Sequence, residues 1–209
     1  MNNSHVKQFP TKQNDPRASR KRNLLKMCLS AAALGASMVV MAQAGEDLEI
    51  MSNNSFEETK GDVPTDWVAN ELVKPMGTMR VLTEKAKDGE KCIEIKTIPS
   101  YKFAIYHKEP IGVVPGDKIK LNVYVKGTGR FRFDLYLYCN RGWDFWGRNI
   151  QDGQVFDVDS EEWSLQTFEL EVPSEENDNG VTVNYVRPAI AVLPNSSLQF
   201  DCFTGTISK

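Results

Sequence analysis

The feature that most restricts the fold of this chain is a series of short segments in which apolar and polar residues alternate. Residues 118–126 place apolar side chains on one face and polar side chains on the other, and residues 161–173 do the same with a slip near Gln166 that predicts a β-bulge. Almost no segment has the spacing of an amphipathic helix. Clusters of Gly, Pro, Asn and Asp predict turns at 115–117, 126–129 and 174–180. The pattern predicts a single all-β sandwich.

Residues 1–44 have the organisation of a secretory signal peptide. A basic cluster from Arg17 to Lys26 precedes the apolar run LSAAALGASMVVM, and AQA follows that run. The run is shorter than the roughly 20 apolar residues that span a membrane, although a short membrane anchor is the alternative. We therefore expect cleavage after Ala44 and a mature chain of residues 45–209, which is exported to the periplasm, the cell surface or the medium.

The charge of the mature segment restricts its partners. Residues 1–44 hold seven of the 25 Lys and Arg residues and one of the 28 Asp and Glu residues. Residues 45–209 therefore keep 18 basic and 27 acidic residues, a formal charge near −9. Nucleic acids and anionic membranes select basic surfaces, so we expect neither nucleic acid nor membrane insertion for the processed chain.

The segment at 130–140 has two different faces. Its apolar positions predict a core side and are Phe131, Phe133, Leu135, Leu137 and Cys139. The intervening positions are Arg130, Arg132, Asp134, Tyr136, Tyr138 and Asn140. Aromatic rings can stack on the C–H faces of sugars, and Arg, Asp and Asn bind hydroxyls with planar geometry, so this face is a candidate glycan-binding surface. Simple cross-strand packing of Tyr136 and Tyr138 on a solvated face is the alternative.

Four segments, in order, resemble the jelly-roll carbohydrate-binding modules grouped as families 4, 9 and 22. They are NNSFEETKGDVPTDW, VPGDKIKLNVYVKGTGRFRF, EEWSLQTFELEVP and RPAIAVLPNSSLQFDCFTGTIS, and together they cover about residues 48–207. The resemblance implies a galactose-binding-like jelly-roll sandwich, with Trp67 packed beneath it as a structural residue. These motifs are more specific to the fold than to any ligand.

The resemblance also implies a structural calcium ion that joins the first strand to the last. Glu57 and Asp201 match carboxylate ligands of the family, and the Ser55 carbonyl and Asp88 would complete the set. Calcium suits such a site because it takes six to eight oxygen ligands at flexible geometry. Cys202 departs from the family pattern, which has a second Asp there. Two surface carboxylates without a metal are the alternative.

The sugar-binding face of such modules lies on a concave sheet. Tyr136, Tyr138, Asn140 and Arg132 lie on a strand that would line this sheet, and Arg187 lies on the late strand that usually neighbours it. Two further groups would extend the face: the tryptophans of the following loop, Trp143 and Trp146, and the flanking pair Tyr106 and His107.

These residues predict an exported, non-catalytic module that recognises a poly- or oligosaccharide, with a separately encoded glycan-degrading enzyme as a possible companion. A structural or protein-binding envelope sandwich without a sugar ligand is the alternative, with Trp143 and Trp146 docking on a partner. An enzyme would depend on His107, the one histidine after residue 44, and no nucleophile elbow, phosphate loop or zinc motif accompanies it.

Overall fold

The structure of the protein is a computed structural model that describes residues 47–69, 77–139, 154–176 and 180–209. The predicted signal peptide and the predicted site residues Asn140, Trp143 and Trp146 lie outside these residues. The described residues form strands without any helix, so none of their elements is a helix long and apolar enough to cross a membrane. The strands are β1 (Leu48–Glu49), β2 (Thr59–Lys60), β3 (Val63–Pro64), β4 (Trp67–Ala69), β5 (Gly77–Leu82), β6 (Cys92–Thr97), β7 (Phe103–His107), β8 (Ile111–Gly112), β9 (Lys118–Tyr138), β10 (Val155–Glu171), β11 (Tyr185–Val192) and β12 (Ser197–Ser208).

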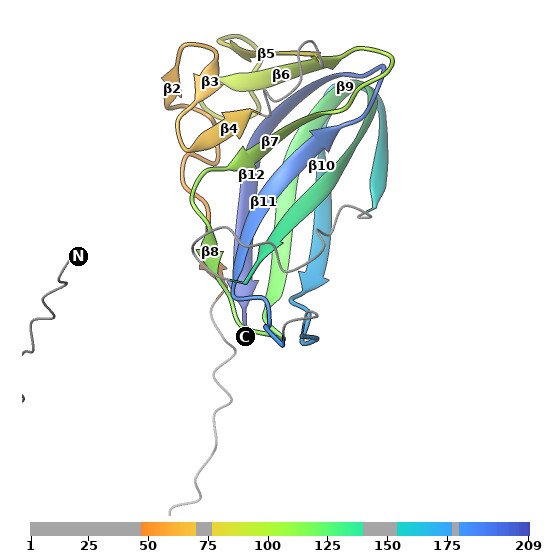
Figure 1. Cartoon of the computed structure of the whole chain (residues 1–209). Coiled ribbons are helices and arrows are strands. Elements are labelled where there is room, and N and C mark those ends of the chain that lie inside the picture. The colour runs from red at the N-terminus through yellow and green to blue at the C-terminus, as the bar shows by residue number, and fades with distance from the viewer. Residues whose placement is uncertain (1–46, 70–76, 140–153, 177–179) are drawn as a thin grey trace, which may run out of the picture. The chain divides into compact units, whose positions relative to one another are not determined.

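The strands form a sandwich in which the long strand β9 belongs to both layers (Figure 1). Its first half, from Lys118 to Thr128, pairs with β12, which pairs in turn with β6 and then β5; we call this the β6 layer. Its second half, from Phe131 to Tyr138, pairs with β11, which pairs with β7 and then β4; we call this the β11 layer. β10 follows the other edge of β9 from Lys118 to Arg132. The arrangement confirms the predicted all-β jelly-roll sandwich.

Residues 126–129, which were predicted to form a turn, instead carry β9 from one layer to the other. Gly127 and Gly129 have φ angles of 118° and 139°, in the region that favours glycine. A Cβ atom at Gly127 would overlap the Ser197 carbonyl oxygen, and one at Gly129 would overlap the Ser196 side chain. The turn prediction was wrong because these glycines permit a close approach of β12 and not a reversal of the chain.

β10 contains the irregularity predicted near Gln166, but at a different position. The register with β9 shifts between Ser160 and Ser164 and is regular from Ser164 to Glu171. Leu165 therefore lies opposite Tyr124 on the outer side and is 51% exposed, although the alternation predicted it for the core.

The core lies between the two layers and consists of the residues that the alternation predicts. The core positions of β9 are at most 1% exposed; they are Ile119, Leu121, Val123, Val125, Phe131, Phe133, Leu135 and Leu137. Trp67 is buried, with its ring centre 5.4 Å from that of Phe56 and 5.1 Å from that of Phe203, which confirms its structural role. Cys139 is half-buried and packs against the core, whereas Cys92 is fully buried.

Candidate functional site

Three tyrosine rings and one guanidinium group gather on the outer side of the β11 layer. Arg187 of β11 lies opposite Tyr136 of β9. The ring centres of Tyr106 and Tyr136 are 5.9 Å apart, and the two rings are perpendicular at 89°. The guanidinium carbon of Arg187 is 5.1 Å from the centre of the Tyr106 ring and 5.7 Å from the centre of the Tyr138 ring. We call these four residues, Tyr106, Tyr136, Tyr138 and Arg187, the tyrosine face.

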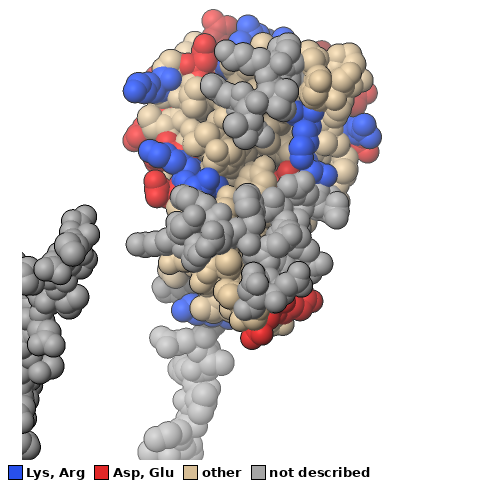
Figure 2. Space-filling model, in the orientation of Figure 1, with Lys and Arg blue, Asp and Glu red and all other residues tan. Residues whose placement is uncertain are grey.

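Small residues next to these side chains explain how the rings reach one another across β11. Ala189 lies between Tyr106 of β7 and Asp134 of β9 in the strand register, and Ala191 lies opposite Ala104. Because alanine extends little above a sheet, the larger tyrosine and arginine side chains have room to lean over it. Figure 2 views the molecule from the side of β7 and β11 and shows Lys, Arg, Asp and Glu side chains toward both edges of this side.

The phenols of Tyr136 and Tyr138 are neutral. Burial, with a smaller contribution from Asp134, raises the pKa of Tyr136 to about 12. Burial also raises the pKa of Tyr138, against the opposing effect of Arg187. Both hydroxyls therefore keep their protons at neutral pH and can donate hydrogen bonds. Tyr138 is only 5% exposed, whereas Tyr106 and Tyr136 are half-buried.

Arg132 belongs to a separate ion pair further along β9. Its Nε donates to Asp134 Oδ1 at 2.6 Å, the Asp134 side chain is fully buried, and the Arg132 side chain is 17% exposed. A buried carboxylate is unfavourable without a cationic partner, so the role of Arg132 in the sheet is to pair with Asp134. The predicted binding residues that the structure brings together are Tyr136, Tyr138 and Arg187, and Tyr106 is the third ring of the face.

His107 lies on the core side of β7 and not beside the tyrosine face. It is 4% exposed, its Nδ1 donates to the Glu109 carbonyl at 3.0 Å, and its Nε2 is 3.3 Å from the Ser52 hydroxyl. That hydroxyl donates to Asp66 at 2.6 Å. The expectation that His107 flanks the face was wrong, because successive residues of a strand point to opposite sides. Burial and the engagement of both ring nitrogens disfavour a role in acid–base catalysis.

Asp201 fastens the turn at residues 85–91 to the last strand. Its Oδ2 accepts hydrogen bonds from the backbone N–H groups of Lys87 and Asp88 at 2.6 and 3.1 Å, and its Oδ1 accepts one from the Cys202 N–H at 2.7 Å. The side chain is fully buried. Burial raises the pKa of Asp201, and these hydrogen bonds oppose that effect without reversing it.

Glu57 fastens the other end of the same turn. Its Oε1 accepts hydrogen bonds from the backbone N–H groups of Glu90 and Lys91, each at 2.9 Å. The Lys91 ammonium reaches back and donates to the Glu57 carbonyl oxygen at 2.5 Å. A cation supplied by the chain itself therefore lies at the corner where the family resemblance implies a calcium ion.

The predicted carboxylate ligands Glu57, Asp88 and Asp201 do not form a group that could hold a metal ion in the described part of the chain. Within the described ranges, no three His, Cys, Asp or Glu side chains lie close enough together to hold a metal ion, and Asp88 is exposed. Calcium requires six to eight oxygen atoms, whereas the facing oxygens of Glu57 and Asp201 are occupied by N–H donors. In the structure these carboxylates are bound by N–H donors of the chain, and calcium binding through Glu57, Asp201, Ser55 and Asp88 stays a prediction of the family resemblance.

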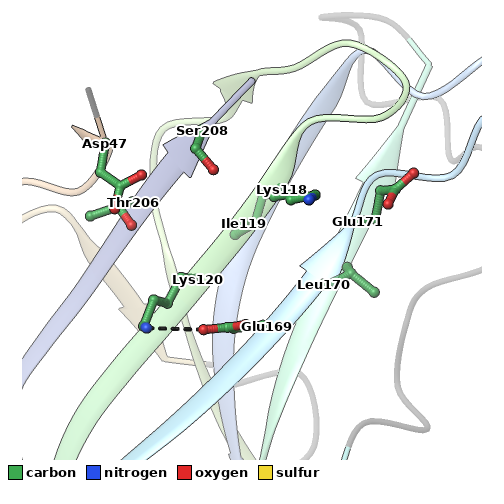
Figure 3. A pocket seen from close by; sticks show the side chains of 9 residues that line it. All are labelled: Asp47, Lys118, Ile119, Lys120, Glu169, Leu170, Glu171, Thr206 and Ser208. Carbon is green, nitrogen blue, oxygen red and sulfur yellow. Dashed lines mark ion pairs between the residues drawn. The ribbon is translucent and has the colours of Figure 1, made fainter. Parts of the chain in front are cut away.

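A hollow of about 430 Å³ lies where β9, β10 and β12 run side by side (Figure 3). It is lined by Asp47, Lys118, Ile119, Lys120, Glu169, Leu170, Glu171, Thr206 and Ser208. Lys120 Nζ and Glu169 Oε1 form an ion pair at 2.9 Å, and both side chains are largely exposed. Exposed pairs contribute little to stability, and the lining has no aromatic ring, so we assign no site to this hollow.

Comparison with known proteins identifies the fold and no closer relationship. No protein-family model matches the chain, and no curated protein sequence matches it. The solved structures that are similar to it include the enzymatically active domain of tailspike protein 4 of bacteriophage CBA120, with a TM-score of 0.58 and 11% identity over 77% of this chain and 21% of that one. The present chain thus spans about a fifth of the tailspike domain.

Two further solved structures match over almost their whole length. One is a cyclase from Fischerella sp., with a TM-score of 0.54 and 14% identity over 78% of this chain and 97% of that one. The other is the CBM22-1 xylan-binding domain of Xyn10C from Paenibacillus barcinonensis, with a TM-score of 0.51 and 16% identity over 80% of this chain and 98% of that one. At these identities the similarity establishes a carbohydrate-binding-module-like β-sandwich fold, which binding domains and a cyclase share.

Proposed function

We propose that the mature chain, residues 45–209, is an exported, non-catalytic module that binds a poly- or oligosaccharide on the tyrosine face. The observation that carries the proposal is the convergence of three tyrosine rings and one guanidinium group on the outer side of the β11 layer. The core side of the same β9 segment is filled by Phe131, Phe133, Leu135 and Leu137, so these rings are not needed to fill the core.

The chemistry of the tyrosine face suits a glycan. Half-buried rings such as Tyr106 and Tyr136 offer flat apolar area for the C–H groups of a sugar, and the neutral hydroxyl of Tyr136 offers hydrogen bonds. The guanidinium of Arg187 is planar and binds adjacent hydroxyl oxygens in the same plane. The xylan-binding domain with the same fold supports a glycan as the class of ligand.

The absence of catalysis is part of the proposal because enzymes also use this fold. The cyclase and the tailspike domain support a catalytic alternative, which would require an accessible acid or base. His107 is buried on the core side, and Asp134 beside the tyrosine face is paired with Arg132. These contacts favour binding over chemistry, with a separately encoded glycan-degrading enzyme as companion and residues 1–44 as the export signal.

The test is calorimetric titration with xylohexaose, preceded by a glycan array to identify better ligands. We expect binding by the wild-type chain, and a five- to thirtyfold weaker affinity for Tyr136→Ala, since a stacked ring contributes roughly 1–2 kcal/mol at about 1.4 kcal/mol per tenfold. Tyr101→Ala is the matched control because Tyr101 is 44% exposed and lies away from the face, in the loop before β7.

Two results would count against the proposal. Equal affinities for Tyr136→Ala and Tyr101→Ala would place any glycan elsewhere on the molecule. The absence of binding to every glycan on the array would favour the alternative of a structural or protein-binding envelope sandwich.

A further inference from the structure

A row of polar side chains crosses the outer side of the β6 layer, the layer that does not carry the tyrosine face. Glu94 of β6 lies opposite Gln199 of β12, and Gln199 lies opposite Lys126 of β9. The three residues line a groove of about 410 Å³, whose other lining residues are Lys85, Gly127, Thr128, Glu161 and Ser197. We call it the Gln199 groove. Its volume lies within the range of about 300–1,000 Å³ that is usual for small-molecule sites.

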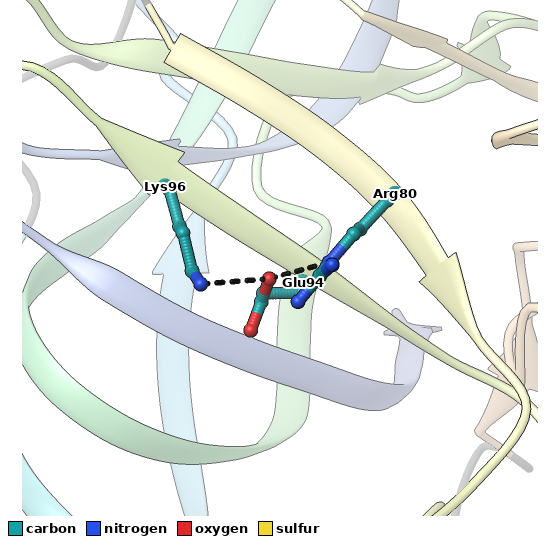
Figure 4. A network of polar contacts seen from close by, with 3 residues as sticks. All are labelled: Arg80, Glu94 and Lys96. Atoms are coloured by element: carbon teal, nitrogen blue, oxygen red, sulfur yellow. Dashed lines mark hydrogen bonds and ion pairs between the residues drawn. The ribbon is translucent and has the colours of Figure 1, made fainter.

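Glu94 supplies a fixed, ionised carboxylate to this groove. It is 7% exposed, and its Oε2 accepts contacts from Arg80 Nε at 2.7 Å and Lys96 Nζ at 3.3 Å. Figure 4 shows that both contacts meet at this one oxygen and that neither dashed line reaches the other carboxylate oxygen. Burial acts to raise the pKa of Glu94, but the hydrogen bonds from Arg80 and Lys96 outweigh it and hold the pKa below its ordinary value. The second oxygen is therefore a charged acceptor.

Gln199 supplies a buried amide oxygen that accepts no hydrogen bond from the described residues. This oxygen, Oε1, is out of contact with solvent, and a buried acceptor without a partner is unfavourable by about 1–3 kcal/mol, so it requires an explanation. The oxygen and nitrogen of an amide can exchange places by rotation, and the nitrogen would then need an acceptor at the same position. A ligand hydroxyl satisfies either orientation, because it both donates and accepts.

Lys126 supplies a positioned donor at the other end of the row. Its ammonium lies 4.4 Å from the centre of the Trp163 ring and donates to the Lys85 carbonyl oxygen at 3.2 Å. Trp163 Nε1 donates to the same carbonyl oxygen at 3.2 Å, which fixes the ring under the ammonium. An ammonium has three hydrogen atoms, so donors remain for a ligand.

We propose that the Gln199 groove binds an uncharged sugar unit through two adjacent hydroxyls, at a site separate from the tyrosine face. One hydroxyl lies between Gln199 and Glu94 and donates to an acceptor there, and its neighbour accepts from Lys126. The lining contains two lysines and two glutamates, so it has no excess of charge that would select an ion. Trp163 is a positioning residue, because it acts through Lys126.

The test is a titration of the ¹⁵N-labelled full chain with D-xylose, followed by NMR. We expect shifts of the Gln199 side-chain amide and of the backbone signals of Glu94 and Lys126. Gln199→Leu keeps the size of the side chain and removes the amide, and we expect it to weaken xylose binding, followed at the Glu94 and Lys126 backbone signals, at least about tenfold. Tyr136→Ala is expected to leave them unchanged. Lys126→Met provides a second variant with the same expected loss, should Gln199→Leu fail to fold.

Xylohexaose separates this inference from the proposed function. Shifts at the tyrosine face with no response of the groove to xylose would overturn the groove and leave the proposed function intact. A response of the groove to xylose with no shift at the tyrosine face would overturn the proposed function and leave the groove intact. D-glucuronate is the third probe, and its binding to the groove in place of xylose would overturn the assignment to an uncharged sugar.

Discussion

Arg187 lies opposite Tyr136 on the neighbouring strand, and its guanidinium carbon also stands 5.1 Å from the centre of the Tyr106 ring on the strand beyond. The arginine therefore joins β9 to β7 across β11. Tyr106 and Tyr136 contact each other at 5.9 Å over the same strand, so removal of the arginine affects both rings.

Arg187→Met tests this link because methionine keeps an unbranched apolar stem and removes the planar cation. Loss of the cation–π contacts should lower the free energy of unfolding by about 1 kcal/mol and the melting midpoint by about 2–4 °C. Affinity for xylohexaose should fall about tenfold, because the guanidinium also binds sugar hydroxyls. Calorimetry measures both quantities. Arg130→Met is the control, since Arg130 is exposed on β9, the strand that carries Tyr136; equal effects of the two variants would contradict the link.

The sandwich could be predicted from the sequence because apolar and polar residues alternate over long segments of β9 and β10. Phe131 and Leu137 lie in the core as the pattern predicts. Two local features could not be predicted from it. The segment that contains Gly127 and Gly129 has a composition typical of turns, and only the packing of β12 against these glycines shows that the strand continues. Leu165 is apolar, but the bulge at Ser160–Ser164 places its side chain on the outer side of β10.

Asp201→Ala should destabilise the protein in EDTA as well as in calcium. The buried carboxylate accepts backbone N–H groups from Lys87, Asp88 and Cys202, and their loss should lower the free energy of unfolding by about 2–4 kcal/mol. Urea denaturation measures the change. Asp201→Asn keeps one oxygen acceptor and should recover part of the loss. A variant as stable as the wild type would show that these hydrogen bonds do not hold the turn.

The same measurements test the predicted calcium ion. An ion bound only by the folded state at a hundredfold its dissociation constant would add about 2.7 kcal/mol. If the wild-type midpoint rises in calcium and that of Asp201→Ala does not, the predicted calcium ion binds at Asp201 in place of the backbone N–H donors. Equal midpoints in calcium and EDTA would leave Lys91 and the turn amides as the partners of these carboxylates.

Stability at alkaline pH should reveal the raised pKa of Tyr136. Its pKa is raised to about 12, mainly by burial, from an ordinary value of 10.0. The unfolded phenol loses its proton near pH 10 and the folded one only near pH 12, so the unfolded state binds fewer protons in between. This contribution to stability is present in full below pH 10 and is lost as the pH rises to about 12. Tyr136→Phe should flatten that decline in urea denaturation; an unchanged slope would contradict the shift.

The tyrosine face was predictable only in part. Tyr136, Tyr138 and Arg187 stand on the polar side of alternating segments, which is a signal that a sequence carries. Tyr106 was harder to predict, because the sequence does not distinguish it from its polar neighbour His107, which lies on the opposite side of β7. The Gln199 groove gave none. Its three residues come from β6, β9 and β12, and only the strand register brings them into one row.

Gly129→Ala should be among the most harmful single substitutions in the domain. Residue 129 has a φ of 139°, which disfavours any side chain, and an added Cβ would also overlap the Ser196 side chain. Gly61→Ala is the matched control, since its φ of 67° imposes backbone strain but no atom lies within 4 Å of the new methyl group. Strain alone is unfavourable by about 1–2 kcal/mol, and overpacking adds about 1–3 kcal/mol, so Gly129→Ala should lose about 2–5 kcal/mol in urea denaturation. Because the bend at Gly129 directs the second half of β9 into the β11 layer, the folded fraction of this variant should also bind xylohexaose less tightly. Similar losses for the two alanine variants would show that β9 passes between the layers without requiring a glycine at this position.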